Sequence, residues 1–371
     1  MRLSSKRSRS TYAALAVGAL ALSTVLSACG STDDSADGPR TLTFGYHIGE
    51  KTSIGELWAW WMDEVEKRTD GSLTFDAFWD GTLVTGPDVV ESLSDGRVDV
   101  ATVIPSLYAN KFPVTSVHEL PFQSSNSPAV SEAMAEIVSD EASPIRAEFD
   151  DENLVPLAWA IGGSSALGTA DPIDSVEDLR GLQIRGNDRS SKVLGAAGAN
   201  IINMGTSDIY GSLDRGLLDG VFGIPFAFIG PLKFPEVVKN FTDTGMGVAA
   251  AVPLSVSQST WDSLTDEQQQ VIREVGAEIP GKIVEFDALY DSKSCAAVNE
   301  AGAKAHVLAP VEVDKLRAAG FDKVSAEWKA AATKAGADAD AVLTSYGNAV
   351  KAAEPNYPEY QTGIASCVES S

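Results

Sequence analysis

Arg185 is the residue whose type and position best suit it for chemistry. It follows the short stretch Leu182-Gln183-Ile184, which is typical of a strand, and it precedes Gly186-Asn187, which is typical of a loop. The end of a strand is a rigid platform, and a guanidinium holds a carboxylate through two charge-assisted hydrogen bonds that a lysine cannot reproduce. The residues alone leave two interpretations open, because an arginine at a strand end is more often a surface ion-pair partner than a ligand contact.

No sequence motif for catalysis, metal binding or nucleotide binding accompanies this arginine. The three histidines, His47, His118 and His306, lie far apart and show no metal-ligand spacing, so we expect no metal site. The glycine cluster at residues 162–165 lacks the spacing that cradles a dinucleotide, and neither a nucleophile elbow nor a phosphate loop occurs. Acidic pairs such as Asp150-Asp151 are expected to be solvated. We therefore expect no catalytic residue, no cofactor and no enzyme activity.

The N-terminus has the pattern of a lipoprotein precursor. Basic residues within the first nine positions precede an uncharged stretch from Thr11 to Ala28, which ends in the lipobox Leu26-Ser27-Ala28-Cys29. We expect residues 1–28 to be a signal peptide, Cys29 to carry lipid, and residues 29–39 to hold this lipidated cysteine and a flexible tether. A plain N-terminal anchor helix is the alternative. The expected location is extracytoplasmic, with the lipid anchor in the cell membrane at a periplasmic face or a Gram-positive outer face.

The charge of the chain limits its partners. It has 28 Lys and Arg against 52 Asp and Glu, and removal of residues 1–28 leaves 24 basic residues against 52 acidic ones, a net charge of −28. Such a surface repels nucleic acid and anionic lipid headgroups, so we expect no nucleic-acid partner and membrane attachment only through acyl chains on Cys29. The two other cysteines, Cys295 and Cys367, form an even pair that suggests one disulfide in an oxidising compartment. Two unpaired buried thiols are the alternative.

The order of strand and helix patterns predicts an α/β fold. Residues 42–46 alternate as a strand, residues 56–68 read as an amphipathic helix that ends near Gly71, and residues 72–78 return as a strand. Repetition of this order predicts largely parallel sheets. The sequence Thr265-Asp266-Glu267-Gln268 is a capping box and marks the start of a later helix, and Ser175 marks another.

An internal repeat at an offset of 120 residues predicts two similar lobes. The repeat pairs Ser92-Leu93, Gly96, Asp99 and Pro105 with Ser212-Leu213, Gly216, Asp219 and Pro225. We expect residues 40–162 with about 247–286 to form lobe I, residues 163–246 with about 287–371 to form lobe II and the C-terminal helices, and a long helix to bridge them. A cleft between the lobes is the expected ligand site, because α/β folds bind ligands at the carboxyl ends of strands. Chance similarity within a common helix-glycine-strand pattern is the alternative.

The chain resembles the DctP family of solute-binding proteins, which serve tripartite ATP-independent periplasmic (TRAP) transporters, from about Leu42 to Trp328. The most specific blocks are residues 90–99, 118–122, 177–185, 209–220 and 261–264. The resemblance implies a two-lobed periplasmic-binding-protein-like fold and TRAP membrane subunits as partners. In that family the arginine that follows Gly-Leu-x-Ile grips the substrate carboxylate, so the resemblance implies a ligand role for Arg185.

The chain also departs from many sugar-acid and dicarboxylate binders of this family. They place a second arginine in the segment that here reads Gly162-Gly163-Ser164-Ser165, and polar residues where Val103-Ile104-Pro105 and Phe222-Gly223-Ile224-Pro225 are apolar here. We therefore expect one carboxylate held by Arg185 and a less polar remainder of the ligand packed against aromatic side chains. The candidate ligand contacts are Arg185, Tyr108, Trp159, Phe222, His47 and Asn187. Core packing is the alternative for each aromatic residue.

These observations predict an extracytoplasmic solute-binding lipoprotein. It would capture a small organic anion by hinge closure and hand it to TRAP membrane subunits, without chemical change to the ligand. Two alternatives remain open at this stage: a secreted lipoprotein hydrolase that uses a carboxylate pair in the same cleft, and a sensory partner of a signalling receptor.

Overall fold

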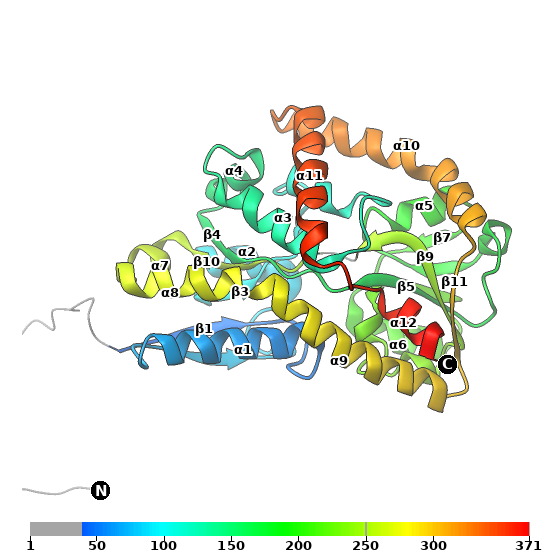
Figure 1. Ribbon diagram of the computed structural model, residues 1–371, viewed down its shortest axis with the longest axis horizontal. Coiled ribbons are helices and arrows are strands. Elements are labelled where there is room, and N and C mark those ends of the chain that lie inside the picture. The colour runs from blue at the N-terminus through cyan, green and yellow to red at the C-terminus, as the bar shows by residue number, and fades with distance from the viewer. Residues whose placement is uncertain (1–38, 249–250, 371) are drawn as a thin grey trace, which may run out of the picture. The chain divides into compact units, whose positions relative to one another are not determined.

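Two β-sheets organise the described part of the chain (Figure 1). The computed structural model describes residues 39–248 and 251–370, which belong to one compact unit. The predicted signal peptide, the predicted lipidation site Cys29 and the predicted tether up to residue 38 lie outside the described residues. Within the described ranges, no helix combines the length and the apolar character that a membrane span requires.

The first sheet contains strands from the N-terminal half of the chain and one later strand. Its strands are β1 (Arg40–Gly45), β2 (Leu73–Phe78), β3 (Val100–Thr102), β4 (Leu154–Ala158) and β10 (Leu254–Ser257), in the order β2-β1-β3-β10-β4. β1 runs parallel to β2 and β3, whereas β10 runs antiparallel to β3 and β4. β10 departs from the expected parallel direction because the chain enters it directly from the second sheet, without the crossover helix that a parallel pair needs.

Helix α1 (Ser53–Arg68) packs against this sheet and begins earlier than predicted. The side chain of Thr52 accepts a hydrogen bond from the backbone N–H of Gly55 and caps the helix, which begins at Ser53, three residues before the predicted start. Trp58 and Trp61 are fully buried in a core that includes Phe44 of β1. The predicted amphipathic helix is therefore present, and the Thr52 cap adds one turn at its start.

The second sheet contains five strands from the middle of the sequence and one later strand. Its strands are β5 (Ser164–Thr169), β6 (Gln183–Arg185), β7 (Asn200–Ile202), β8 (Gly220–Pro225), β9 (Asn240–Val248) and β11 (Lys304–Val307), in the order β11-β9-β5-β8-β6-β7. β6 runs parallel to both of its neighbours, β7 and β8. The carboxyl ends of these three strands therefore lie together at one edge, and Arg185 is the last residue of the middle one.

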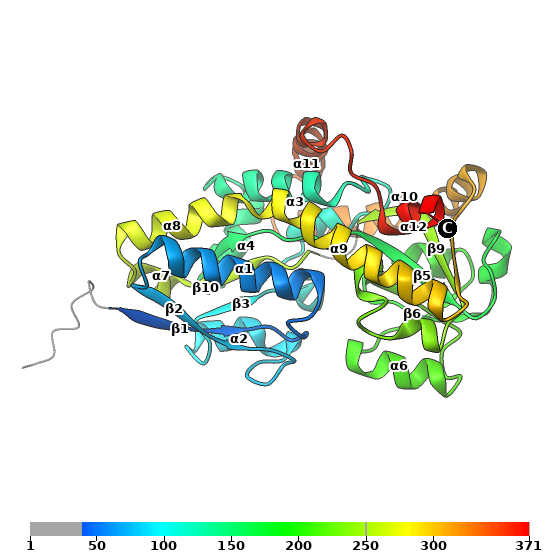
Figure 2. The same ribbon diagram turned by 60° about the horizontal axis from the view of Figure 1, so that its bottom comes forward.

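The chain crosses between the sheets through two segments and one long helix. Residues 159–163 join β4 to β5, and residues 251–253 lead into β10; an isolated β-bridge pairs Ile161 with Ala251. Helix α9 (Ile279–Glu300) packs against α1 beside the first sheet, as Figure 2 shows, and it also contacts β11 of the second sheet. The predicted long helix that bridges the two halves is present.

The internal repeat corresponds to the same local structure in each sheet. Helix α2 (Val89–Ser94) and helix α6 (Thr206–Asp214) each lead through a glycine with positive φ, Gly96 or Gly216, into a strand. In the first sheet the carboxylate of Asp99 accepts a hydrogen bond from the backbone N–H of Thr43 at 2.8 Å. In the second sheet the carboxylate of Asp219 accepts one from the backbone N–H of Gln183 at 2.7 Å. Each repeat aspartate thus ties its own strand to the neighbouring strand.

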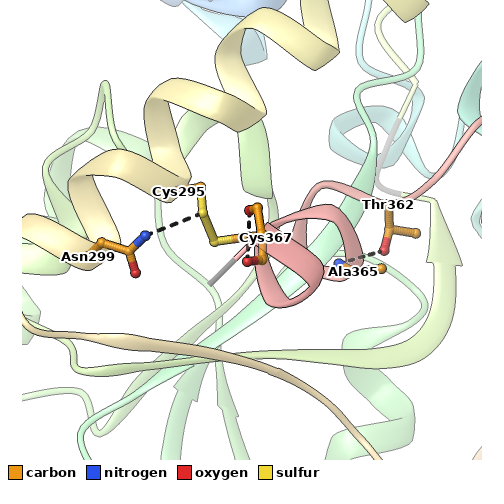
Figure 3. Close-up of a disulfide and its surroundings, with 6 residues drawn as sticks. Cys295, Asn299, Thr362, Ala365 and Cys367 are labelled. Carbon is orange, nitrogen blue, oxygen red and sulfur yellow. Dashed lines mark hydrogen bonds between the residues drawn. A yellow bond between two sulfur atoms is a disulfide. The ribbon is translucent and has the colours of Figure 1, made fainter.

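The remaining helices cover the sheets and include a disulfide-linked C-terminus. They are α3 (Ser127–Ser139), α4 (Pro144–Asp151), α5 (Ser191–Ala196), α7 (Gln258–Asp262), α8 (Asp266–Ala277), α10 (Pro310–Lys334), α11 (Ala339–Ala353) and α12 (Gly363–Ser370). Helix α8 begins at the capping box of Thr265 and Gln268. Helix α10 packs on α5 beside the second sheet, whereas α11 packs on α3 beside the first. Cys295 of α9 forms a disulfide with Cys367 of α12 (Figure 3).

Candidate ligand-binding site

A cavity of about 490 Å³ lies between the carboxyl ends of strands from the two sheets. The wall from the first sheet contains residues 46–48, which follow β1, and residues 104, 106 and 107, which follow β3. The wall from the second sheet contains Arg185 of β6, residues 203–207 after β7 and residues 223–225 of β8. This is the position at which α/β proteins bind small molecules, because side chains and loops converge beyond the strand ends.

Backbone carbonyl groups of the two neighbouring strands hold the Arg185 side chain. Its Nε donates to the carbonyl oxygen of Met204, which follows β7, and its Nη1 donates to the carbonyl oxygen of Phe222 in β8, both at 3.2 Å. Arg185 is 2% exposed. Its Nη2 makes no hydrogen bond to any other residue in the described ranges. The guanidinium is therefore fixed in orientation and retains donor capacity.

The Arg185 charge lacks a direct ion-pair partner within the described part of the chain. There, no carboxylate oxygen lies within 4.0 Å of its guanidinium nitrogens. Burial lowers the pKa of Arg185, and the nearby carboxylate of Asp188 raises it in part. A buried charge without a partner is strongly unfavourable, so this geometry favours an anion in the cavity.

Gly223 leaves room for Arg185 and Asp188. Its φ is +81°, and a Cβ atom at this position would lie 3.2 Å from Asp188 Oδ2 and 3.6 Å from Arg185 Nη1. Both the backbone conformation and the close approach of these side chains therefore favour glycine. Asp188 Oδ1 accepts a hydrogen bond from the backbone N–H of Ser191 at 2.8 Å, which fixes its position beside the arginine.

The loop after Arg185 also contacts the first half of the structure. Arg189 donates to Ser116 Oγ from Nε at 3.0 Å and from Nη2 at 2.8 Å. Ser190 Oγ donates to the carbonyl oxygen of Glu119 at 3.3 Å. Burial, followed by the charge of Asp188, raises the pKa of Glu119 to about 8. Glu119 is therefore mostly protonated at neutral pH, which limits repulsion between these two buried carboxyl groups.

Comparison with known proteins identifies the family. The sequence profile described as bacterial extracellular solute-binding protein, family 7 (DctP) matches residues 44–329. The chain belongs to the DctP family. Among its relatives is a solute-binding protein of Albidiferax ferrireducens, which is 25% identical over 248 residues, 65% of this chain and 71% of the relative. The resemblance inferred from the sequence blocks is confirmed.

Solved structures of TRAP solute-binding proteins share the fold. One from Rhodoferax ferrireducens T118, in complex with copurified benzoate, has a TM-score of 0.78 at 24% identity and covers 85% of this chain and 99% of its own. Another, from a marine metagenome and in complex with 3-hydroxybenzoate, has a TM-score of 0.75 at 22% identity and covers 85% and 98%. The two-lobed α/β fold predicted for this chain is confirmed; the lobe boundaries given above stay a prediction.

Three of the predicted ligand contacts line the cavity of this chain: Arg185, His47 and Asn187. The imidazole of His47 makes no hydrogen bond to another described residue, and its Nδ1 is buried. Burial lowers the pKa of His47 to about 4, so the ring is neutral at pH 7. The Asn187 amide likewise makes no side-chain hydrogen bond within the described ranges, and its polar atoms are available to a ligand.

The three predicted aromatic contacts do not line the cavity, so this part of the prediction needs correction. The Tyr108 hydroxyl donates to the carbonyl oxygen of Gly86 at 2.6 Å. Trp159 is 1% exposed and packs edge-on against Phe149. Phe222 is fully buried, and its backbone carbonyl, not its ring, supports Arg185. These rings pack in or against the hydrophobic core, the alternative that the sequence had left open.

The apolar part of the cavity wall is instead mostly aliphatic, and the internal repeat contained a signal for it. Ile104 and Ile224 occupy equivalent positions 120 residues apart, and both line the cavity. The lining residues that the sequence analysis missed include Tyr46, Ile48, Ile104, Met204, Ile224 and Phe228, with the polar groups Asp80, Ser106 and Asn203. Most of them lie just after a parallel strand, where ligand contacts are expected in this class of fold.

The two other histidines have structural hydrogen bonds. His118 Nε2 lies 3.2 Å from the backbone nitrogen of Ala251, whose N–H it accepts, and Nδ1 lies 2.8 Å from the carbonyl oxygen of Thr115. His306 Nε2 lies 2.9 Å from the carbonyl oxygen of Ile173. Over residues 39–248 and 251–370, no group of three or more His, Cys, Asp or Glu is arranged to hold a metal ion.

Proposed function

We propose that this DctP-family protein is an extracytoplasmic lipoprotein that binds a small organic acid and delivers it to TRAP membrane subunits. The observation that carries the proposal is the buried guanidinium of Arg185, which faces the cavity without an ion-pair partner among the described residues. A ligand carboxylate would supply that partner through charge-assisted hydrogen bonds. The orientation of the guanidinium is already set by Met204 and Phe222, so little ordering would be needed on binding.

The ligand we propose has one carboxylate and a largely apolar body. Arg185 is the only arginine or lysine among the described residues that line the cavity, and most of the other lining side chains are apolar. The benzoate and 3-hydroxybenzoate complexes of similar proteins support a ligand of this kind. The aliphatic wall would bury the body of such a ligand, with a gain of about 25 cal/mol per Å² of apolar surface removed from water.

Closure of the two halves around the ligand is the proposed binding mechanism. They are joined at residues 159–163, by the β-bridge between Ile161 and Ala251 and by α9, an arrangement that is typical of a hinge. Closure would exclude water from the cavity and strengthen the ion pair with Arg185. The ligand would leave unchanged, and the closed form would be the one that docks on the membrane subunits.

We propose the lipid anchor from the lipobox at residues 26–29. Metabolic labelling with a radioactive fatty acid tests it in cells that produce the full chain. We expect label and membrane association in the parent and neither in Cys29→Ala. Absence of label in the parent would contradict the lipid anchor and would leave the proposed binding site untouched.

A thermal-shift screen tests the ligand class. The library should contain monocarboxylates, dicarboxylates, sugar acids and aromatic acids. Ligand at 100 times its Kd adds about 2.7 kcal/mol, enough to raise the Tm by a few degrees. A hit that is lost in Arg185→Ala supports the proposal, whereas failure of every acid to stabilise the protein contradicts it.

The two alternative functions have less support. A hydrolase with a carboxylate pair would need two acids in the cavity, and Asp80 is the only aspartate or glutamate among the described lining residues. Recovery of unchanged ligand after long incubation tests this alternative. A sensory role would use the same cleft. If deletion of the gene abolishes ligand-induced expression while ligand uptake continues, the protein acts in sensing and not in delivery.

A further inference from the structure

We propose that the ligand carries a neutral hydrogen-bonding oxygen in addition to its carboxylate, and that His47 and Asp80 select it against a second carboxylate. This inference rests on the proposed function, because it assumes an acid bound at Arg185. It concerns the opposite wall of the same cavity, where His47 follows β1 and Asp80 follows β2. A hydroxy or keto monocarboxylic acid is the ligand class that fits both walls.

His47 offers a polar contact that the protein leaves unused. Its ring packs edge-on against Tyr46, with ring centres 5.1 Å apart. The ring lines the cavity, and within the described ranges neither ring nitrogen has a hydrogen-bond partner. A neutral imidazole has one donor and one acceptor, and a polar group buried without a partner is unfavourable. A ligand hydroxyl, which both donates and accepts, or a keto oxygen, which accepts, would satisfy one of the nitrogens.

His47 carries no positive charge with which to bind a second carboxylate. Burial holds its pKa near 4, so the ring is neutral over the physiological pH range. Protonation would also place an imidazolium in an apolar setting, which the same desolvation opposes. The wall formed by the first sheet therefore lacks a counterpart to Arg185.

Asp80 makes this wall unfavourable for an anion. Its backbone is in the left-handed region, with φ of +57°, and its N–H donates to the carbonyl oxygen of Ile48 at 3.2 Å. The carboxylate lies against Gly49, where a Cβ atom would come within 2.9 Å of Oδ1. In the part of the chain that the structure describes, no Lys, Arg or His nitrogen lies within 4.0 Å of it. Asp80 is exposed, so solvent weakens its field, but its unpaired negative charge at the cavity wall would still repel a second ligand carboxylate, a repulsive element of the kind that specificity often requires.

Calorimetric titration of the purified protein with two matched sets of acids tests the inference. The aromatic set is benzoate, 3-hydroxybenzoate and benzene-1,3-dicarboxylate; the aliphatic set is butanoate, 4-hydroxybutanoate and succinate. In at least one set, we expect the hydroxy acid to bind about five- to tenfold more tightly than its parent, the range for one added neutral hydrogen bond. The dicarboxylate of that set should bind more weakly than the hydroxy acid.

Variants assign this selection to the two residues. His47→Phe keeps an aromatic ring without nitrogen atoms, so the ratio of the Kd of the parent acid to that of the hydroxy acid should fall to about one. His47→Leu serves the same purpose if the phenylalanine variant fails to fold. Asp80→Asn should raise the affinity for the dicarboxylate relative to that for the parent acid about threefold or more. Asp76→Asn is the matched control, because Asp76 on β2 is exposed like Asp80 but does not line the cavity.

The outcomes separate this inference from the function on which it rests. If the acids bind through Arg185 but the dicarboxylate equals or exceeds the hydroxy acid, the inference is wrong and the proposed function stands. A hydroxyl preference that persists in both His47 variants also overturns it. If no acid of either set or of the thermal-shift library binds, or if Arg185→Ala binds like the parent, the proposed function and the inference are both wrong.

Discussion

Arg185 Nη1 lies 3.2 Å from the carbonyl oxygen of Phe222, so the strand next to β6 holds the cation of the candidate site in place. The carbonyl oxygen of Met204 holds Nε from the other neighbouring strand at the same distance. The side chain therefore does not have to be ordered by the ligand. The guanidinium therefore lies at the end of a strand, and the first prediction separates the effect of its charge from that of its planar shape.

Replacement of Arg185 should abolish high-affinity binding of the acid found by the thermal-shift screen. We expect Arg185→Ala to cost about 3–5 kcal/mol, a loss of roughly 100- to 1000-fold or more, because the ligand carboxylate would be buried without a partner. Arg185→Lys should recover only part of this loss, since a lysine keeps the charge but not the planar fork. Calorimetric titration measures both. Arg215→Ala removes an exposed arginine near the end of α6 and should bind like the parent; a Kd for Arg185→Ala within threefold of the parent contradicts the prediction.

Gly223→Ala should damage both stability and binding. Its added Cβ would meet Asp188 and Arg185 at 3.2 and 3.6 Å, and φ of +81° is unfavourable for alanine by about 1 kcal/mol. Gly216→Ala provides a matched control, because Gly216 also has positive φ, at +66°, but a Cβ there would have no atom within 4 Å. We expect denaturant unfolding to show a loss in both variants, and calorimetry to show weaker ligand binding only in Gly223→Ala. Equal binding by the two variants would mean that the arginine tolerates the methyl group.

Loss of the disulfide should destabilise the protein. Cys295 and Cys367 are 72 residues apart, and release of a loop of this size is expected to cost about 2–4 kcal/mol. The free energy of unfolding should therefore fall in the double variant Cys295→Ser/Cys367→Ser. A reducing agent should lower the stability of the parent to a similar level and leave the double variant unchanged. Stability of the parent that does not depend on reductant, with the bond shown to be broken, would contradict the prediction.

Glu119 should make stability fall as the pH rises. Burial raises its pKa in the folded protein to about 8, above the value of about 4.3 for an unperturbed glutamate. The folded state keeps this proton to higher pH than the unfolded chain, so its contribution is complete below about pH 4 and is lost as the pH rises to about 8. Glu119→Gln should therefore gain stability relative to the parent at pH 9 compared with pH 5. Chemical denaturation at the two pH values measures this difference, and Glu91→Gln, an exposed position on α2, should not show it.

The sequence by itself determined the α/β class, the repeat and the arginine of the candidate site. These features follow from local patterns: alternation predicts β1, a capping box predicts the start of α8, and a short strand followed by glycine predicts the end of β6. The repeat also had structural meaning, because Asp99 and Asp219 make equivalent hydrogen bonds to neighbouring strands. Periodicity and helix caps depend on residues that are close together in the sequence, so the sequence alone is sufficient to predict them.

Only the tertiary structure decided which side chains line the cavity. Phe222 and Ile224 belong to the same strand, β8, yet Phe222 is buried in the core and Ile224 lines the cavity. Trp159 after β4 and Ile104 after β3 differ in the same way. The direction of each depends on the layer that packs against its strand, and those layers come from distant segments of the chain. The antiparallel direction of β10 has the same origin, because it follows from the return of the chain between the sheets. Contacts between residues far apart in sequence fix these choices, and no local pattern specifies them.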